Sequence, residues 1–374
     1  MLVNLFETVC STIMVYSYAV DVAIFFTHSL LMRVCVTGGG GFIGSHLAKR
    51  LKTLGHYVIV ADWKKNEYME PNEFCDEFRC VDLRILQNCL DATCDCEEVY
   101  HLAADMGGMG FIQSNHGMIL FNNTVMSCHI VEACRINKVR KLFYASSACI
   151  YPMYKQSNAD IGSGLKESDA WPAQPEDSYG LEKLCTEELC LHYAKDFGLE
   201  VRIARFHNVY GPYGTWHGGR EKAPAALCRK VFASHDTVEI WGDGEQTRSF
   251  MYIDDCIEGI LKIMQSDIST PINLGSAELV SINQMAEIVK QIAGKTHLRL
   301  EHLEGPIGVR GRNSDNTMIK EKLGWEPSYP LHDGLMKTYD WVSKQMELQK
   351  EKGTDISVFK HSKVFELQCP AVVG

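Results

Sequence analysis

Short apolar runs alternate with amphipathic stretches from residue 33 onward. Runs rich in β-branched residues predict strands, and stretches with apolar positions three or four apart predict helices. The predicted strands cover residues 33–37, 57–61, 98–102, 141–145 and 201–205, and the clearest helices cover residues 45–54, 123–136 and 178–197. Strands that alternate with helices form parallel βαβ units, so the pattern predicts an α/β fold with a doubly wound parallel sheet of the Rossmann type.

This alternation loosens after Gly211, where Gly- and Pro-rich loops separate helices such as residues 282–292. The change predicts a smaller, substrate-binding domain over the carboxyl edge of the sheet, where ligands of open α/β folds lie. The predicted division is a Rossmann domain at 33–210, the smaller domain mainly at 211–345 with some segments returning to the first, and a tail at 346–374.

Residues 1–32 form an apolar N-terminal extension with Asp21 in its best run. The segment lacks the basic start and the small-residue cleavage pattern of a signal peptide. A charge at the centre of a lone membrane helix costs about 3 kcal/mol on insertion scales. Three interpretations stay open: a membrane anchor, a flexible or docked extension, and a misassigned start with Met32 directly before the first strand.

The formal net charge of −10 argues against a nucleic-acid partner, because no broad basic field is available to attract phosphate backbones. Local basic clusters in an acidic chain suit a small anionic ligand better than a polymer. These clusters are Arg220, Lys222, Arg229 and Lys230, and then Arg310 and Arg312.

The chain has 15 cysteines and no Cys-x-x-Cys motif. An odd, scattered set of cysteines in a long chain is most simply read as reduced thiols in a cytoplasmic protein, so neither a disulfide framework nor a metal site is expected. Most of these cysteines are expected to be small core residues.

A glycine-rich turn, VTGGGGFIGSH, lies between the first predicted strand and the first helix. Glycines at positions 38, 41 and 44 permit a tight turn and close approach of the backbone to a pyrophosphate, with Phe42 and Ile43 at the start of the helix. Asp62 ends the second strand, where a carboxylate accepts hydrogen bonds from a ribose diol and repels a 2′-phosphate. The cofactor is therefore expected to be NAD, held by Gly38, Gly41, Phe42, Ile43, Gly44 and Asp62, with Asp82 near the adenine.

Tyr-x-x-x-Lys occurs twice, and only one copy suits a helix. Pro152 interrupts the copy from Tyr151 to Lys155. Tyr179 and Lys183 lie in a strong helix former, where residues four apart share a face. A phenol titrates near pH 10, and a neighbouring ammonium together with an oxidised nicotinamide would lower its pKa towards neutrality.

The glycine spacing, Ser146 and Ser147 at the end of a strand, and the Tyr179–Lys183 pair resemble the extended short-chain dehydrogenase/reductase superfamily. The resemblance extends from residue 33 to about residue 340. It implies that Tyr179 takes a hydroxyl proton while hydride passes to NAD. It also implies a homodimer formed through helices 123–136 and 178–197.

Several longer segments resemble a narrower family, the GDP-mannose 3,5-epimerases. They read SSACIYP, DMGGMGF, TWHGGREKAP and GVRGRNSDN, with ADWKKNE and ESDAWP. The resemblance implies inversion at C3 and C5 of GDP-D-mannose through a transient C4 ketone, on the route to ascorbate and cell-wall sugars. It implies Cys149 and Lys222 as the base and acid, since a thiol beside positive charge is a competent base and an ammonium returns a proton.

The same resemblance implies the substrate contacts. Basic side chains are expected to pair with the charge of the diphosphate, and polar side chains are expected to form further hydrogen bonds with the substrate. Glycine would let backbone amides approach the sugar. The expected substrate-binding residues are Gly107, Ser147, Ala148, Cys149, Asn208, Glu221, Lys222, Ala223, Lys230, Gln246, Arg248, Arg312 and Ser362.

Two other classes of function stay open. Another sugar-nucleotide 4-epimerase, a 4,6-dehydratase or a dehydrogenase would share the fold, but dehydratases need a carboxylate pair where this chain has Ala148 and Cys149. A non-catalytic NAD-binding protein is disfavoured because Tyr179 and Lys183 are both present. His217 stands where the epimerases have lysine, with no role assigned to it.

Overall fold

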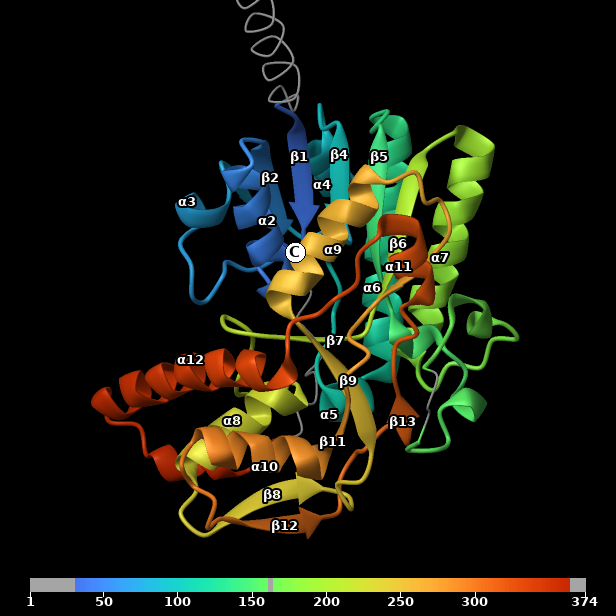
Figure 1. The fold of residues 1–374 in the computed structure, drawn as a ribbon. Helices are drawn as coiled ribbons and strands as arrows, with labels where there is room; N and C mark the ends of the chain where they lie inside the picture. Colours follow the sequence, from blue (N-terminus) through green and yellow to red (C-terminus); the bar gives the residue numbers. More distant parts are fainter. Residues whose placement is uncertain (1–30, 161–163, 364–374) are drawn as a thin grey trace, which may run out of the picture.

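The computed structural model describes residues 31–160 and 164–363. Its centre is a seven-stranded sheet in the order β10-β6-β5-β4-β1-β2-β3, with every neighbouring pair parallel (Figure 1). The strands are β1 (Arg33–Thr37), β2 (Tyr57–Asp62), β3 (Glu77–Cys80), β4 (Glu98–His101), β5 (Lys141–Ser147), β6 (Glu200–Phe206) and β10 (Ile272–Leu274). The prediction of a doubly wound parallel sheet is confirmed.

Helices cover both faces of this sheet, because alternate residues of each strand point to opposite sides. Val34 and Val36 of β1 share one apolar cluster with Leu47 of α2, whereas Cys35 shares a second cluster with Ile130 of α6. The helices around the sheet are α2 (Phe42–Thr53), α3 (Pro71–Phe74), α4 (Leu86–Thr93), α6 (His116–Ile136), α7 (Ser178–Phe197), α9 (Ile253–Gln265) and α11 (Thr317–Leu323).

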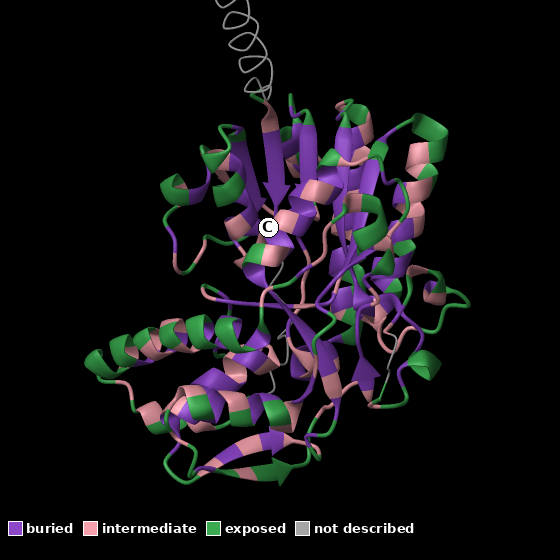
Figure 2. Ribbon diagram, viewed as in Figure 1, coloured by how far each residue is buried: buried purple, intermediate pink, exposed green. Residues whose placement is uncertain are grey.

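A smaller assembly lies beyond the carboxyl ends of the central strands, in the lower half of Figure 1. Its strands are β7 (Asn208–Tyr210), β8 (Thr237–Trp241), β9 (Thr247–Tyr252), β11 (Leu279–Ser281), β12 (Arg299–Leu303) and β13 (Gly311–Arg312). Its helices are α5 (Met109–Ile112), α8 (Ala223–Ala233), α10 (Ile282–Ile292), α12 (Leu331–Glu351) and the short η4 (Ile356–Lys360). Figure 2 shows the central strands buried and the outer side of α12 exposed.

The observed elements differ from the predicted ones in several places, of which three affect the sheet and the longest helices. Strands β3 and β10 were not predicted, since each is very short and gains its stability from pairing at an edge of the sheet. Helix α6 begins at His116 rather than at residue 123. Helix α12 continues to Glu351, past the predicted start of the tail at residue 346.

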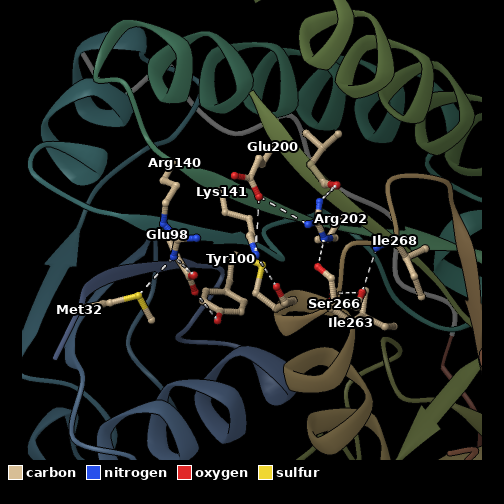
Figure 3. A network of polar contacts seen from close by, with 12 residues as sticks. Met32, Glu98, Tyr100, Arg140, Lys141, Glu200, Arg202, Ile263, Ser266 and Ile268 are labelled. Atoms are coloured by element: carbon tan, nitrogen blue, oxygen red, sulfur yellow. Dashed lines mark hydrogen bonds and ion pairs between the residues drawn. The ribbon is translucent and has the colours of Figure 1, made fainter. Parts of the chain in front are cut away.

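Polar side chains fasten α9 to the amino edge of the sheet (Figure 3). The Lys141 ammonium donates to the carbonyl of Met264 at 2.9 Å, and Arg202 Nε donates to the carbonyl of Ser266 at 2.7 Å. Glu200 pairs with both cations, at 3.7 and 3.5 Å. These charged side chains therefore stabilise the fold at the amino ends of the strands, on the opposite side of the sheet from the glycine-rich turn.

No helix within the described residues is long and apolar enough to cross a bilayer. Residues 1–30, which make up most of the apolar extension, lie outside the part of the chain that the structure describes. The three interpretations of this extension therefore stay predictions.

Candidate active site

The glycine-rich turn leaves no room for side chains. Gly38 has φ +73°, and a Cβ on it would lie 2.7 Å from the backbone of Ala103. A Cβ on Gly44 would lie 2.2 Å from the carbonyl oxygen of Gly38. Gly41 caps α2 without a side-chain hydrogen bond, and Phe42 and Ile43 form its first turn. The bare N-terminus of α2 therefore fits a dinucleotide pyrophosphate.

Asp62 ends β2 beside this turn. Its carboxylate accepts hydrogen bonds from the backbone N–H of Gly40 at 3.0 Å and of Lys64 at 3.1 Å. Burial raises the pKa of Asp62, and these hydrogen bonds oppose the rise. Asp82 is instead bound by Arg84, whose hydrogen bonds lower the pKa of Asp82. The residues present fit a dinucleotide, with Asp62 facing the turn and Asp82 held in a salt bridge.

Tyr179 lies in the first turn of α7, which begins where Asp177 accepts a hydrogen bond from the N–H of Gly180. The Lys183 ammonium donates to the carbonyl of Ala145 at 3.0 Å and lies 5.7 Å from the centre of the Tyr179 ring. Burial, followed by nearby Cys149, raises the pKa of Tyr179 well above 10. Burial sets this direction in the protein alone, whereas the expected lowering also included the positive charge of an oxidised nicotinamide.

The two adjacent serines have different surroundings. Ser146 is buried and donates to Glu187, which also holds Arg205 at 2.8 Å. Ser147 lines the cavity described below, and its hydrogen bond with Tyr179 lowers the pKa of that phenol. Only Ser147 is therefore placed to contact a substrate.

A buried polar chain lies behind Lys183, and the sequence did not indicate it. Thr37 contacts His101 Nδ1 at 2.7 Å, and the Ser127 hydroxyl lies 3.2 Å from His101 Nε2 and 3.3 Å from a carboxylate oxygen of Glu182. Burial lowers the pKa of His101 to about 3, so this ring is neutral. The chain supports the backbone of α7 without reaching the cavity.

A cavity of about 200 Å³ lies between the carboxyl edge of the sheet and the smaller assembly. Catalytic candidates Cys149, Tyr179 and Lys222 line it, whereas Lys183 lies behind Tyr179. Every residue expected to bind the substrate lies on its wall: Gly107, Ser147, Ala148, Cys149, Asn208, Glu221, Lys222, Ala223, Lys230, Gln246, Arg248, Arg312 and Ser362. Trp241, Glu239 and Lys363 also line it and were not expected.

Besides the exposed Lys363, four basic side chains on this wall form no ion pair within the described residues: Lys222, Lys230, Arg248 and Arg312. The buried Arg229 close by does have a carboxylate partner, Glu221, at 2.9 Å. Burial lowers the pKa of Lys230 to about 8, and burial with the neighbouring Arg312 lowers the pKa of Arg248 to about 9. Desolvated cations of this kind are stabilised by an anion, and a diphosphate supplies one.

The polar groups on the wall are partly occupied. Asn208 Nδ2 donates to the carbonyl of Ser249 at 3.0 Å, and Gln246 Nε2 donates to that of Trp241 at 3.1 Å. The Oε1 atom of Gln246 is buried and has no partner in the described structure. It is free to accept a hydrogen bond from a ligand in the cavity.

The C-terminal segment closes one side of the cavity. Arg229 donates to the carbonyls of Phe359 and His361, which places Ser362 and Lys363 on the wall. His217 meets Phe359 edge to face, with ring centroids 5.7 Å apart, outside the cavity lining.

Comparison with known proteins shows the family of the chain. Residues 34–275 match the model of the NAD dependent epimerase/dehydratase family. Over 343 residues the chain is 59% identical to GDP-mannose 3,5-epimerase 1 of Oryza sativa subsp. indica, covering 92% of this chain and 90% of that protein. The GDP-mannose 3,5-epimerase of Arabidopsis thaliana gives the same 59% identity and coverage.

Among solved structures, UDP-glucuronic acid 4-epimerase from Bacillus cereus, in complex with UDP-glucuronic acid and NAD, has a TM-score of 0.70 at 27% identity. The match covers 84% of this chain and 100% of that chain. With its glycine-rich turn, its Tyr179–Lys183 pair and a match over residues 34–275, the chain belongs to the NAD dependent epimerase/dehydratase family.

Proposed function

We propose that the protein is an NAD-dependent isomerase that inverts C3 and C5 of GDP-D-mannose to give GDP-L-galactose, with GDP-L-gulose as the C5-only product. The observation that carries the proposal is the meeting of Cys149, Lys222 and Tyr179 on one cavity wall. A phenol suffices for C4 chemistry alone, whereas the additional thiol and amine supply an acid and a base for neighbouring carbons. The 59% identity to GDP-mannose 3,5-epimerases supports this substrate.

The cofactor is held by Gly38, Gly41 and Gly44 at its pyrophosphate and by Asp62 at its adenosine ribose. When bound, NAD would supply the hydride acceptor, and later the hydride donor, for C4 of the sugar. Tyr179 takes the proton of the C4 hydroxyl and gives it back at the end. Ser147, hydrogen-bonded to the phenol, keeps Tyr179 directed at the sugar.

A ketone at C4 acidifies the hydrogens on C3 and C5, because either carbanion delocalises into an enolate. Cys149 takes the proton from one face of the ring, so that an S–H bond forms as the C–H bond breaks. Lys222 returns a proton to the same carbon from the other face. Burial lowers the pKa of Lys222, which makes the ammonium a readier acid.

The diphosphate lies among Lys230, Arg248 and Arg312, with the N-terminus of α8 at Ala223 adding the positive end of its dipole. Gln246 Oε1 accepts a hydrogen bond from the nucleoside. Glu221 binds Arg229 and the N–H of Gly219, and so fixes the turn that carries Lys222.

The protein is further proposed to be a cytoplasmic homodimer that pairs through α6 and α7. Large apolar side chains are exposed on these two helices: Leu120, Phe121, Leu181 and Phe197. A second copy would remove them from water. Light scattering tests this point, with Phe121→Asp expected to give a monomer.

The test of the reaction is NMR of GDP-mannose incubated with the purified holoenzyme in deuterated water. Deuterium at C3 and C5, with no net change in NADH, is expected. Inversion at C4 without this exchange would indicate a 4-epimerase, and loss of water would indicate a dehydratase. Cys149→Ser is expected to stop the exchange and keep NAD binding, and exchange at the wild-type rate would overturn the role of the thiol.

A further inference from the structure

Three side chains lie in a row: Cys149 and Arg312 on the cavity wall, and Gln156 behind them. Arg312 Nη1 lies 3.1 Å from Cys149 Sγ, and Arg312 Nε donates to Gln156 Oε1 at 2.6 Å. Gln156 is fully buried, and its own Nε2 donates to the carbonyl of Tyr151 at 2.9 Å. We propose that Gln156 is a positioning residue that holds the guanidinium of Arg312 against Cys149, so that Arg312 stabilises the thiolate form of the base.

The orientation of Arg312 depends on this contact. Arg312 lies in β13, a strand of only two residues paired to β9. Nε is engaged by Gln156, so Nη1 is left to point at the sulfur. A guanidinium is planar, and fixing one edge by a hydrogen bond therefore fixes the direction of the other.

Gln156 also binds the same strand through its main chain. Its carbonyl accepts from the N–H of Arg310 at 3.0 Å and of Gly311 at 3.2 Å. These bonds do not depend on the side chain of residue 156. Replacing the amide thus removes the hold on the guanidinium while the strand stays docked, which separates positioning from folding.

A neutral acceptor suits this position. A glutamine oxygen binds Arg312 without cancelling its charge, whereas a carboxylate would neutralise the cation and repel a thiolate. Arg312, Arg248 and Lys222 are the cations facing Cys149, and Tyr179 is the other titratable group there. Glu176 is the acidic group near the two arginines.

The inference rests on the proposed function, because the thiolate matters only if Cys149 is the base. The experiment measures iodoacetamide alkylation of Cys149 in the NAD-bound enzyme between pH 6 and pH 9, read on the Cys149 peptide by mass spectrometry. The variants are Gln156→Met, which removes the acceptor, and Gln156→Glu, which keeps it and adds a charge. Gln87→Met, on the exposed side of α4, is the matched control.

Both Gln156 variants are expected to alkylate Cys149 about tenfold more slowly at pH 7, with the rate recovered about one pH unit higher. The thermal midpoint is expected to fall in both, because both lose the buried hydrogen bond from Nε2 to the Tyr151 carbonyl. Gln87→Met is expected to match the wild type. Wild-type alkylation profiles in both Gln156 variants would overturn the inference. If Gln156→Met does not fold, Gln156→Asn takes its place, since the shorter amide withdraws the acceptor from Arg312 without adding a charge.

Deuterium exchange into GDP-mannose is followed in the same samples. If the wild type shows no exchange at C3 and C5, the proposed function fails, whereas the alkylation profiles still report on the positioning of Arg312.

Discussion

The ammonium group of Lys183 lies 5.7 Å from the centre of the Tyr179 ring and one helical turn further along α7. It is bound by a strand carbonyl from the sheet, so it adds positive charge behind the phenol without donating to its oxygen. Burial keeps the pKa of Tyr179 high in the protein alone. In the proposed reaction, proton transfer at C4 is therefore expected to depend on the charge of the bound cofactor together with that of Lys183.

Tyr179→Phe is expected to reduce deuterium exchange into GDP-mannose by about 10²–10⁴-fold, the usual contribution of a general acid–base group. The ring stays in the apolar cluster with Phe111 and Ile112, so the thermal midpoint is expected to change little. Tyr193→Phe, at the outer side of α7, is the control. Exchange within tenfold of wild type in Tyr179→Phe would place the proton acceptor elsewhere.

Asp62→Asn is expected to weaken NAD binding by about 10–100-fold, because hydrogen bonds to a charged acceptor contribute about 1.5–3 kcal/mol. The discrimination against NADP is expected to shrink at the same time, since the repelling charge is lost. Calorimetric titration of both cofactors measures this, with Asp91→Asn on the surface of α4 as the control. Unchanged NAD affinity would show that Asp62 only orders the turn through Gly40.

Local signals explain which parts of the fold the sequence predicted. Helix α7 was predicted from end to end because Asp177 caps its start and Gly198, in the left-handed region, ends it. Strands β3 and β10 were missed because tertiary pairing, rather than their own few residues, makes them strands. The division into domains stays a prediction.

The candidate site likewise has a part that local motifs predicted and a part that depends on contacts between distant residues. The cofactor turn and the Tyr179–Lys183 pair are local motifs, and family resemblance pointed to the substrate-binding residues on the wall but not to Trp241, Glu239 or Lys363. Gln156 was missed because its partner, Arg312, is 156 positions away, and no local pattern records such a contact. The high pKa of Tyr179 was missed for a related reason, since burial is a property of the whole fold.

The affinity for GDP is expected to fall by up to about tenfold between pH 7 and pH 9. The pKa of Lys230 is lowered to about 8 by burial, so its ammonium is present below that pH and is lost above it. Titration calorimetry at constant ionic strength measures the effect. Lys230→Met is expected to bind GDP more weakly at pH 7 and to show a flatter pH dependence; equal slopes would contradict this role.

Glu187→Gln is expected to destabilise the protein by about 3–5 kcal/mol, because it leaves the charge of buried Arg205 without its partner. Glu132→Gln removes the half-exposed pair with Arg135 and is expected to cost less than about 1 kcal/mol. Urea denaturation of the two variants gives the comparison. Similar shifts of the two midpoints would mean that the buried pair contributes no more than a surface one.

The last described residues complete the wall of a cavity whose catalytic tyrosine lies in the first half of the chain. Six of the seven central strands, the glycine-rich turn and Tyr179 all precede residue 207, whereas Ser362 and Lys363 come after α12. Because N-terminal units fold first during synthesis, the order of the chain is also an order of assembly. During synthesis the glycine-rich turn and Tyr179 are therefore made, and can fold, before the segment that completes the cavity wall.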